Sequence, residues 1–312
     1  MTKIKNKTHE DNYFTNMLGL YIDKIQEKQI SKDIWGYRTG YEEYDSLMNG
    51  LHNSELTVIA ARHSIGKTSF VLNVAYNISS ISEIPVLYIS YDMSMEAILE
   101  RLVSSQSGIA SEAIKKKVLN QKEWDSLVET INKLHELFQS NKFQIIPSCN
   151  LYYKDLFDTI RNFKKEHENG VVIVDYFQLV KLNKDEETRY IELTGLAAAF
   201  KNLTMELNLP IILVSQVSKK CDERINKRPR LSDLSECDAL AQHCDNLIFI
   251  YREDYYQEID YETEEDETSA KSKGVAEFIV AKHKQGPRGS FKLLFQENIS
   301  KFKNPIHYTD NF

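Results

Sequence analysis

The residues Leu56 to Phe70, LTVIAARHSIGKTSF, have the types and the spacing of a loop that binds phosphate groups. Gly66, Lys67 and Thr68 follow an apolar run and precede a helical pattern, which is the context that the motif G-x-x-x-x-G-K-[ST] requires. In such a loop the backbone N–H groups and the start of the helix face the phosphates, the lysine neutralises their charge, and the threonine hydroxyl holds Mg²⁺. The sequence therefore predicts a nucleotide site with magnesium. The alternative is an ordinary strand, turn and helix that contains these three residues by chance.

One position departs from this motif, because Ala61 stands where the first glycine is expected. That position needs only a small residue if the chain leaves the strand with a negative φ, and alanine meets this requirement. A second segment supports the site: VVIVDYFQL places Asp175 at the end of an apolar strand, where a carboxylate can complete the shell of a Mg²⁺ ion. Taken alone, Asp175 has a second interpretation as the cap of a strand end.

Alternating strands and helices are predicted to position these residues. The predicted strands are Leu56–Ala61, Val86–Ser90, Phe143–Pro147, Val171–Asp175, Pro210–Ser215, Asn246–Tyr251, Val275–Ala281 and Phe291–Phe295. The predicted helices are Lys67–Ser79, Met95–Ser107, Lys122–Gln139, Tyr153–His167 and Tyr190–Leu207. Runs such as VVIVD and IILVS are nearly all apolar, so both of their faces must be covered, which is typical of a parallel sheet in an α/β fold. The later strands have no helices between them and are expected to extend that sheet in antiparallel fashion.

The composition favours one main domain in the cytoplasm. The chain has 312 residues, of which 42% are hydrophobic, and this is enough for one large core without disulfides. No apolar run is long enough to cross a membrane, and the N-terminus has no apolar core of a signal peptide. The four cysteines are expected to be reduced thiols, because Cys237, His243 and Cys244 lack the spacing and the fourth ligand of a zinc site.

Charge and periodicity divide the chain further. The net charge of −7 argues against a coat protein for nucleic acids, yet residues 219–230, KKCDERINKRPR, are basic. Residues 253–273 are crowded with acidic side chains and are predicted to form a mobile insertion. Residues 1–33 are predicted to form an arm with an amphipathic helix over Asp11–Gln29, and residues 305–312 a tail.

Several motifs in order resemble the motor domain of the DnaB-type replicative helicases, a RecA-like ATPase domain of superfamily 4. These motifs are GYRTGYEEYDSLMNG, LYISYDMS, VDYFQLV, PIILVSQVSKK, KRPRLSDL and AKHKQGPRG, and the likeness covers residues 34–304. Members of that family commonly have alanine at the first loop position. The resemblance implies a RecA-like P-loop fold, a linker-type helix in the N-terminal arm, ATP and Mg²⁺ as ligands, and assembly into a hexameric ring.

The resemblance also implies roles for individual residues. The implied ATP contacts are Ala61, Ser64, Gly66, Lys67, Thr68, Ser69, Arg101 and Lys282, and the implied metal ligands are Thr68 and Asp175. The implied catalytic residues are Asp92, Lys67, Gln216 and Lys284. Asp92 replaces the glutamate that aligns the attacking water and is one methylene shorter, so hydrolysis is expected to be slower. Lys284 replaces an arginine finger and lacks its planar, two-pronged geometry, so its effect across a subunit interface is expected to be weaker. A plain surface arginine is the alternative for Arg101, and a solvated basic strand is the alternative for the two lysines.

The resemblance finally implies contacts with single-stranded DNA and other partners. The implied DNA-binding residues are Lys219, Arg224, Arg228, Arg230 and Glu236. Ser235 and Asp238 depart from the family, since they replace an arginine and a glycine, and both changes disfavour phosphate binding. A primase or a helicase loader is a further expected partner. The leading hypothesis is an ATP-driven helicase that translocates on DNA, and the alternative is an ATP-binding assembly or regulatory protein that does not translocate. A RecA-fold recombinase or clock-type protein is a remote third hypothesis.

Overall fold

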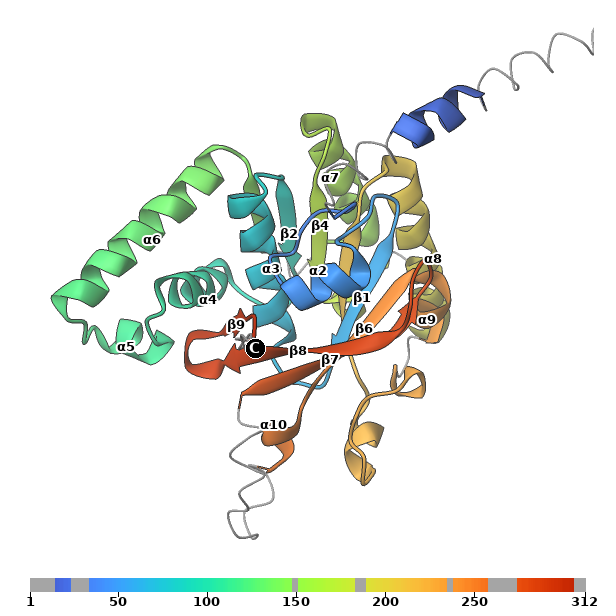
Figure 1. The fold of residues 1–312 in the computed structure, drawn as a ribbon. Coiled ribbons are helices and arrows are strands. Elements are labelled where there is room, and N and C mark those ends of the chain that lie inside the picture. The colour runs from blue at the N-terminus through green and yellow to red at the C-terminus, as the bar shows by residue number, and fades with distance from the viewer. Residues whose placement is uncertain are drawn as a thin grey trace, which may run out of the picture.

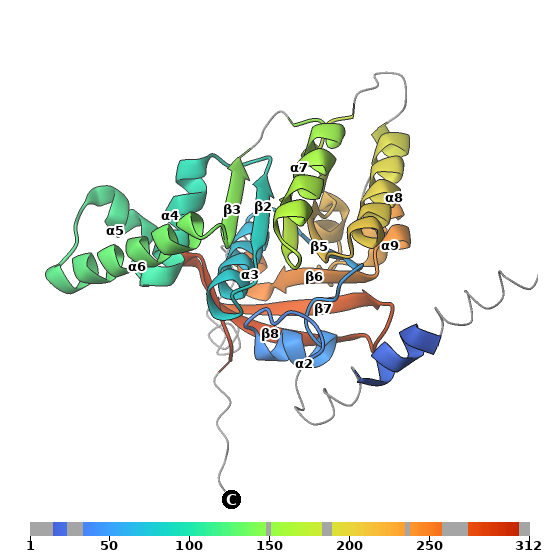
Figure 2. The ribbon, with the colours of Figure 1, turned by 90° about the horizontal axis from the view of Figure 1, so that it is seen from above.

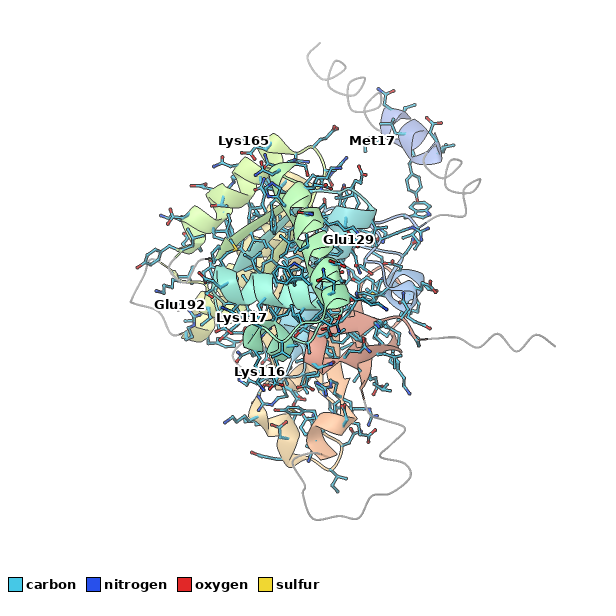
Figure 3. The ribbon with its side chains drawn as sticks, turned by 90° about the vertical axis from the view of Figure 1, so that its left-hand side faces the viewer. Met17, Lys116, Lys117, Glu129, Lys165 and Glu192 are labelled. Atoms are coloured by element: carbon cyan, nitrogen blue, oxygen red, sulfur yellow. The ribbon has the colours of Figure 1, made fainter. Side chains whose placement is uncertain are left out.

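The structure is a computed structural model, and it describes residues 15–23, 34–147, 151–182, 189–234, 238–257 and 274–305. Within these residues the chain forms an α/β fold around one large sheet (Figure 1). Residues 15–23 form a helix of the N-terminal arm with exposed side chains, and Figure 3 labels Met17 on it. No helix among the described residues is long and apolar enough to span a lipid bilayer.

The sheet has nine strands in the order β3-β2-β4-β5-β1-β6-β7-β8-β9. Their bounds are β1 Leu56–Ala61, β2 Val86–Ser90, β3 Phe143–Pro147, β4 Val171–Asp175, β5 Ile211–Gln216, β6 Asn246–Arg252, β7 Val275–His283, β8 Gly289–Gln296 and β9 Lys301–Lys303. The strands from β3 to β6 pair in parallel, whereas β7, β8 and β9 are added in antiparallel fashion. This confirms the predicted parallel centre and its antiparallel extension.

Helices cover both faces of the sheet. Their bounds are α2 Glu42–Met48, α3 Lys67–Ile81, α4 Met95–Ser107, α5 Ser111–Lys116, α6 Gln121–Gln139, α7 Tyr153–Glu166, α8 Arg189–Leu207, α9 Asp238–His243 and α10 Glu253–Gln257. Helices α7, α8 and α9 lie on one face, and α2 lies on the other (Figure 2).

The two faces have separate apolar cores, and β1 contributes to both. Ile59 packs with α2 and α3 on one face, whereas Val58 packs with α7 and α8 on the other. Successive side chains of a strand point to opposite faces, so a strand buried on both sides must be largely apolar. All six residues of β1 are buried. The apolar runs in the sequence therefore follow directly from the two helical layers.

Local signals set the start of two helices on the outer layer. Helix α4 begins after Ser94, whose hydroxyl accepts a hydrogen bond from the Ala97 amide. Helix α6 begins with a capping box, in which Asn120 accepts from the Glu123 amide and the Glu123 carboxylate accepts from the Asn120 amide. Such caps satisfy amides that have no partner inside the helix.

The structure corrects several boundaries and adds elements that the sequence did not predict. The added elements are α2, α5, α9, α10 and β9. The first residues of the segment 253–273, which was predicted to be a mobile insertion, are described: Glu253–Gln257 form α10, in which Asp254 accepts hydrogen bonds from the Tyr255 amide and from the Arg252 guanidinium. Residues 258–273 lie outside the described part of the chain, as does the C-terminal tail after residue 305.

Candidate nucleotide site

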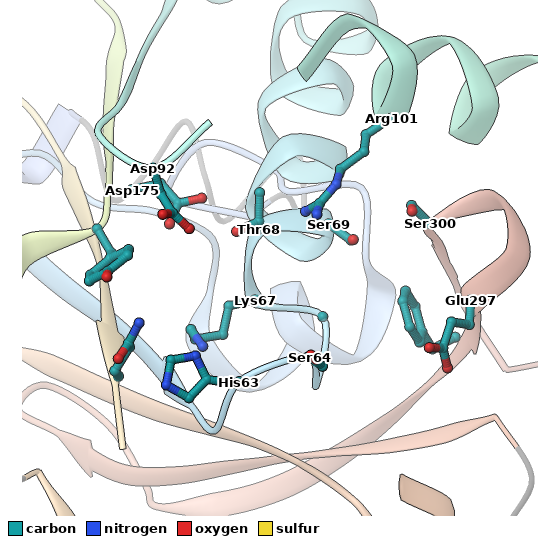
Figure 4. A pocket seen from close by; sticks show the side chains of 14 residues that line it. His63, Ser64, Lys67, Thr68, Ser69, Asp92, Arg101, Asp175, Glu297 and Ser300 are labelled. Atoms are coloured by element: carbon teal, nitrogen blue, oxygen red, sulfur yellow. The ribbon is translucent and has the colours of Figure 1, made fainter. Parts of the chain in front are cut away.

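A pocket of about 460 Å³ opens where the carboxyl ends of the central strands meet the start of α3 (Figure 4). Ligands of open parallel sheets bind at this edge. The residues that line it are His63, Ser64, Gly66, Lys67, Thr68, Ser69, Asp92, Arg101, Asp175, Tyr176, Gln216, Phe295, Glu297 and Ser300. They come from five separate segments of the chain, so the fold assembles the site.

The loop between β1 and α3 has the geometry of a phosphate cradle. Gly66 has φ 112°, and a Cβ atom at this position would lie 3.1 Å from Phe302 and 3.3 Å from Phe295. Only glycine fits both the left-handed backbone and the tight space. Lys67 and Thr68 follow as the first residues of α3, whose unpaired amides and positive dipole end face the pocket.

Lys67 lies largely buried at the base of the pocket, and its Nζ donates to the Arg62 carbonyl at 2.9 Å. Burial lowers the pKa of this amine to about 8, and the nearby positive charge of Arg62 acts in the same direction. The carboxylates of Asp175 and Asp92 oppose this shift but do not cancel it. An amine in this state gains stability when an anion is placed beside it.

Two carboxylates lie across the pocket from the lysine, beside Thr68 (Figure 4). Asp175 ends β4 and is buried, and its Oδ2 accepts a hydrogen bond from the Tyr88 hydroxyl at 2.7 Å. The Thr68 hydroxyl also donates to Asp175. Burial raises the pKa of Asp175, and the negative charge of Asp92 adds to the rise, whereas these hydrogen bonds and Lys67 lower it. A cation beside the two carboxylates would relieve this unfavourable charge.

This set of donors fits Mg²⁺ held jointly by protein and phosphate. A hydroxyl and a buried carboxylate are the oxygen ligands that Mg²⁺ takes in such sites, where phosphate oxygens and water supply the rest. Among the residues that the structure describes, no group of three or more His, Cys, Asp or Glu side chains could hold a metal ion by itself. Any metal at Thr68 and Asp175 therefore depends on the ligand's own oxygens.

Gln216 ends β5 and points its amide into the pocket beside Tyr176, with which it shares a side-chain hydrogen bond. Its backbone is held by Gln178 from the 3-10 helix Phe177–Leu179: the Gln216 amide donates to Gln178 Oε1 at 3.3 Å, and Gln178 Nε2 donates to the Gln216 carbonyl at 3.4 Å. Contacts with Gln178 thus fix the backbone of Gln216, from which its side-chain amide extends into the pocket.

The opposite end of the pocket is formed by residues from the C-terminal strands. Glu297 and Ser300 lie there, and Arg101 reaches in from α4 (Figure 4), whereas the Phe295 ring lies beside Gly66. The Glu297 carboxylate is held by the buried Arg252 at 2.9 Å. The pocket thus combines the cations Lys67 and Arg101 and the backbone amides around Gly66 with carboxylates and an aromatic ring, which suits a phosphorylated nucleoside with a metal ion.

Most of the predicted site residues meet in this pocket. Those that line it are Ser64, Gly66, Lys67, Thr68, Ser69, Asp92, Arg101, Asp175 and Gln216. Ala61 is completely buried in β1 and serves as the exit from the strand rather than as part of the wall. His63, Tyr176, Phe295, Glu297 and Ser300 were missed. The first two adjoin predicted residues in sequence, so spacing could have found them, but no motif pointed to the other three.

Lys282 and Lys284 lie at the other edge of the sheet. Lys282 pairs in register with Leu247 at the start of β6, whereas the pocket lies at the carboxyl ends of the parallel strands. Lys282 Nζ donates to the Ala241, Gln242 and Cys244 carbonyls at the end of α9. Lys284 is largely exposed, and its Nζ lies 3.3 Å from Asp245 Oδ1. Neither lysine lines the pocket of its own chain, so their predicted role across a subunit interface stays a prediction.

The basic segment is partly neutralised inside the protein. Arg224 pairs with the buried Asp233 at 2.7 Å, and Arg228 pairs with Glu277 at 2.7 Å. Lys219 and Arg230 are exposed to solvent. Glu236, with Ser235, lies outside the described residues, and the exposed Asp238 begins α9. Fewer basic side chains are therefore available to bind DNA than the sequence suggests.

Comparisons with known proteins show which family this chain resembles. Residues 36–304 match the model of the DnaB-like helicase C-terminal domain. The replicative DNA helicase DnaB of Buchnera aphidicola subsp. Baizongia pistaciae (strain Bp) is 35% identical over 274 residues, which are 88% of this chain and 56% of that protein. The replicative DNA helicase DnaC of Bacillus subtilis (strain 168) is 30% identical over 284 residues, which are 90% of this chain and 60% of that protein. The chain thus spans somewhat more than half the length of these relatives.

Solved structures show the same fold. The ATPase domain of G40P superposes with a TM-score of 0.84 at 28% identity, and the match covers 94% of this chain and 98% of that one. A DnaB-like replicative helicase, solved with its interactions with primase, gives a TM-score of 0.81 at 28% identity, with 91% of this chain and 66% of that one covered. The predicted RecA-like ATPase fold is confirmed. The chain belongs to the family of the DnaB-like helicase C-terminal domain.

Proposed function

We propose that the chain is the motor domain of a DnaB-type replicative helicase, which hydrolyses ATP between subunits of a ring, moves along single-stranded DNA and unwinds the duplex. The observation that carries this proposal is the convergence of Lys67, Thr68, Asp92 and Asp175 on one pocket. Membership of the helicase family gives the class of reaction, and this convergence gives a place for its chemistry.

In this proposal the residues of the pocket have different roles in ATP binding and hydrolysis. Lys67 and the amides around Gly66 bind the β- and γ-phosphates, and Thr68 and Asp175 hold Mg²⁺, which neutralises charge on the phosphate oxygens. Asp92 accepts a proton from the attacking water and aligns it. Gln216 contacts the γ-phosphate, and its fixed backbone lets it report whether that group is present.

The proposed ring supplies what one chain lacks. Lys284 of one subunit reaches the phosphates in the pocket of the next, because its own pocket lies at the opposite edge of the sheet. The helix of residues 15–23 supports self-association, since its apolar side chains Met17, Leu18, Leu20, Tyr21 and Ile22 are between 48% and 64% exposed. Single-stranded DNA would lie along Lys219 and Arg230, and a primase or a loader would bind the assembled ring.

An ATPase assay with and without single-stranded DNA tests the proposal. Turnover should rise with DNA in the wild type and fall at least about a hundredfold in Lys67→Ala, because the phosphates lose their main cation. Lys165→Ala on α7 is the matched control, since Lys165 is an exposed lysine remote from the pocket (Figure 3), and it should keep wild-type turnover. Wild-type turnover that does not respond to DNA would contradict a translocating motor.

A second function is favoured by three departures from the family. Asp92, Asp238 and Lys284 each replace a residue that serves hydrolysis or DNA binding, so an ATP-gated assembly that barely turns over is the alternative. Asp92→Glu separates the two. In a motor this variant should hydrolyse ATP at least as fast as the wild type, whereas in the alternative it should bind ATP and stay inactive. Light scattering with a non-hydrolysable ATP analogue and Mg²⁺ tests the ring itself, and a single monomeric species at high concentration would contradict it.

A further inference from the structure

Arg62 lies inside the phosphate loop, but its side chain points away from the pocket and into the protein. Its guanidinium is 11% exposed and contacts two other segments. Nε and Nη2 both lie 2.9 Å from Asp222 Oδ2, and Nη1 donates to the Val217 carbonyl at 2.9 Å. A planar group held by three contacts to two partners cannot shift relative to one partner without disturbing its contact with the other.

The two segments that Arg62 contacts are those that follow Gln216. Val217 is the next residue in the chain, and its amide donates to the Ala61 carbonyl at 3.1 Å. Asp222 lies in the 3-10 helix Lys219–Glu223, which begins the basic segment. One side chain of the phosphate loop therefore links that loop to the end of β5 and to the start of the basic segment.

Asp222 also contacts residues other than Arg62. Its Oδ1 accepts hydrogen bonds from the Tyr256 hydroxyl at 3.0 Å and from Cys221 Sγ at 3.3 Å. The Tyr256 ring carries the Lys227 amine at 5.1 Å from its centroid. Both oxygens of Asp222 are thus engaged, and the basic segment is fixed between the phosphate loop and α10. A displacement of Arg62 would therefore also disturb the contacts that Asp222 makes with Tyr256 and Cys221.

The backbone of Arg62 is linked to the ligand-binding amine. The Arg62 carbonyl accepts the hydrogen bond of Lys67 Nζ at 2.9 Å, and a phosphate that draws the amine away from the carbonyl removes this contact. Arg62 then loses a partner on its backbone while its side chain still holds Val217 and Asp222. Binding of a phosphate therefore changes the contacts of Arg62, and Arg62 in turn contacts the basic segment through Asp222.

We propose that Arg62 is a positioning residue that couples the phosphate pocket to the basic segment through Val217 and Asp222. This inference rests on the proposed function for its ligand, a nucleoside triphosphate. Coupling of this kind is reciprocal: nucleotide changes the state of the basic segment, and DNA held on that segment changes the affinity for nucleotide by the same factor.

Hydrogen exchange of the backbone amides tests the inference without any need for DNA-dependent activity. The full chain is measured with and without a non-hydrolysable ATP analogue and Mg²⁺, in the wild type and in Asp222→Ala. In the wild type the analogue should slow exchange in residues 65–69 and also change exchange in residues 218–224, by about fivefold or more. In Asp222→Ala the first effect should remain and the second should disappear.

Controls separate a positioning role from a structural one. Glu206→Ala breaks another arginine–carboxylate pair, Arg161 with Glu206 at 2.8 Å on the surface, and should leave both effects intact. Asp222→Glu keeps the charge and should restore most of the response of residues 218–224. If Asp222→Ala does not fold, Asp222→Asn keeps the shape of the side chain and should weaken the same response.

The outcomes distinguish this inference from the function on which it rests. Protection of residues 65–69 with no response in residues 218–224, or with an equal response in Asp222→Ala, overturns the coupling and leaves the ATP site in place. No protection of residues 65–69 in the wild type overturns the ATP site, and the coupling with it. The coupling further predicts that the bound analogue changes the affinity of the wild type for single-stranded DNA by about fivefold or more, and that Asp222→Ala loses this change.

Discussion

The charge state of Lys67 should make nucleotide affinity depend on pH above neutrality. Burial lowers the pKa of the free amine from 10.5 to about 8, and this shift corresponds to about 3 kcal/mol of lost stability for the charged form. A triphosphate beside the amine stabilises the charge and raises the pKa again. Binding therefore takes up a proton at any pH between the two values, and the affinity is highest below pH 8.

The magnitude follows from the fraction of protein that carries the charge. At pH 7 about nine molecules in ten have a protonated Lys67, whereas at pH 9 about one in eleven does. The dissociation constant of a non-hydrolysable ATP analogue with Mg²⁺ should therefore rise about tenfold between pH 7 and pH 9. Two other groups that line the pocket are shifted away from this range, because burial lowers the pKa of His63 and raises that of Tyr176.

Isothermal titration calorimetry in buffers of different ionisation enthalpy measures both the affinity and the proton uptake. Lys67→Arg is the control, because a guanidinium remains charged over this range, and its affinity should be weaker but flat. An affinity that is constant from pH 7 to pH 9 in the wild type, without proton uptake at pH 9, would refute the interpretation that burial lowers the pKa of Lys67 to about 8. An equal slope in Lys67→Arg would assign the effect to another group.

Other perturbations follow from the same contacts. Gly66→Ala should destabilise the fold by about 1–3 kcal/mol in urea denaturation, because its φ of 112° and the adjacent phenylalanine rings exclude a Cβ; an unchanged midpoint would contradict this. Tyr88→Phe should cost about 1–3 kcal/mol in the same assay, since the buried Asp175 loses a donor, and a stability equal to the wild type would show that the carboxylate finds another partner. Lys219→Gln should reduce the slope of log affinity for single-stranded DNA against log salt by about 0.7, and an unchanged slope would remove this lysine from the DNA surface. Arg224→Gln should instead lower the melting temperature, because its charge is bound to a buried aspartate; a loss of DNA affinity with no change in melting would reverse this assignment.

The central part of the fold could be predicted because its signals are local. The strand Val171–Asp175 is apolar throughout and ends in a carboxylate, so both its burial and its chemistry are written in five consecutive residues. The strand Lys301–Lys303 was missed because three residues with two lysines carry no such pattern, and its strand form depends on pairing with β8. Helix α2 was missed because its residues lie among turn-forming ones, and its stability comes from Tyr44 and Met48 packing into the core.

The site was predictable to the extent that its residues follow strand ends. Asp92 and Gln216 were placed through motifs, and the parallel sheet brings them together, since the carboxyl ends of its strands share an edge. Glu297 and Ser300 belong to a segment without any motif, and only the antiparallel extension places them at the pocket. The ion pairs of Arg224 with Asp233 and of Arg228 with Glu277 could not be predicted either, because no local sequence pattern indicates which residues will pair.

The contact of Phe295 and Phe302 with Gly66 has a consequence for how the protein is made. Translation produces the phosphate loop well before it produces Phe302, whose ring closes the space beside Gly66. Until then the loop has its glycine, lysine and threonine without the wall that shapes them. Competence to bind ligand should therefore appear only after Phe302 has been synthesised and β9 has paired with β8.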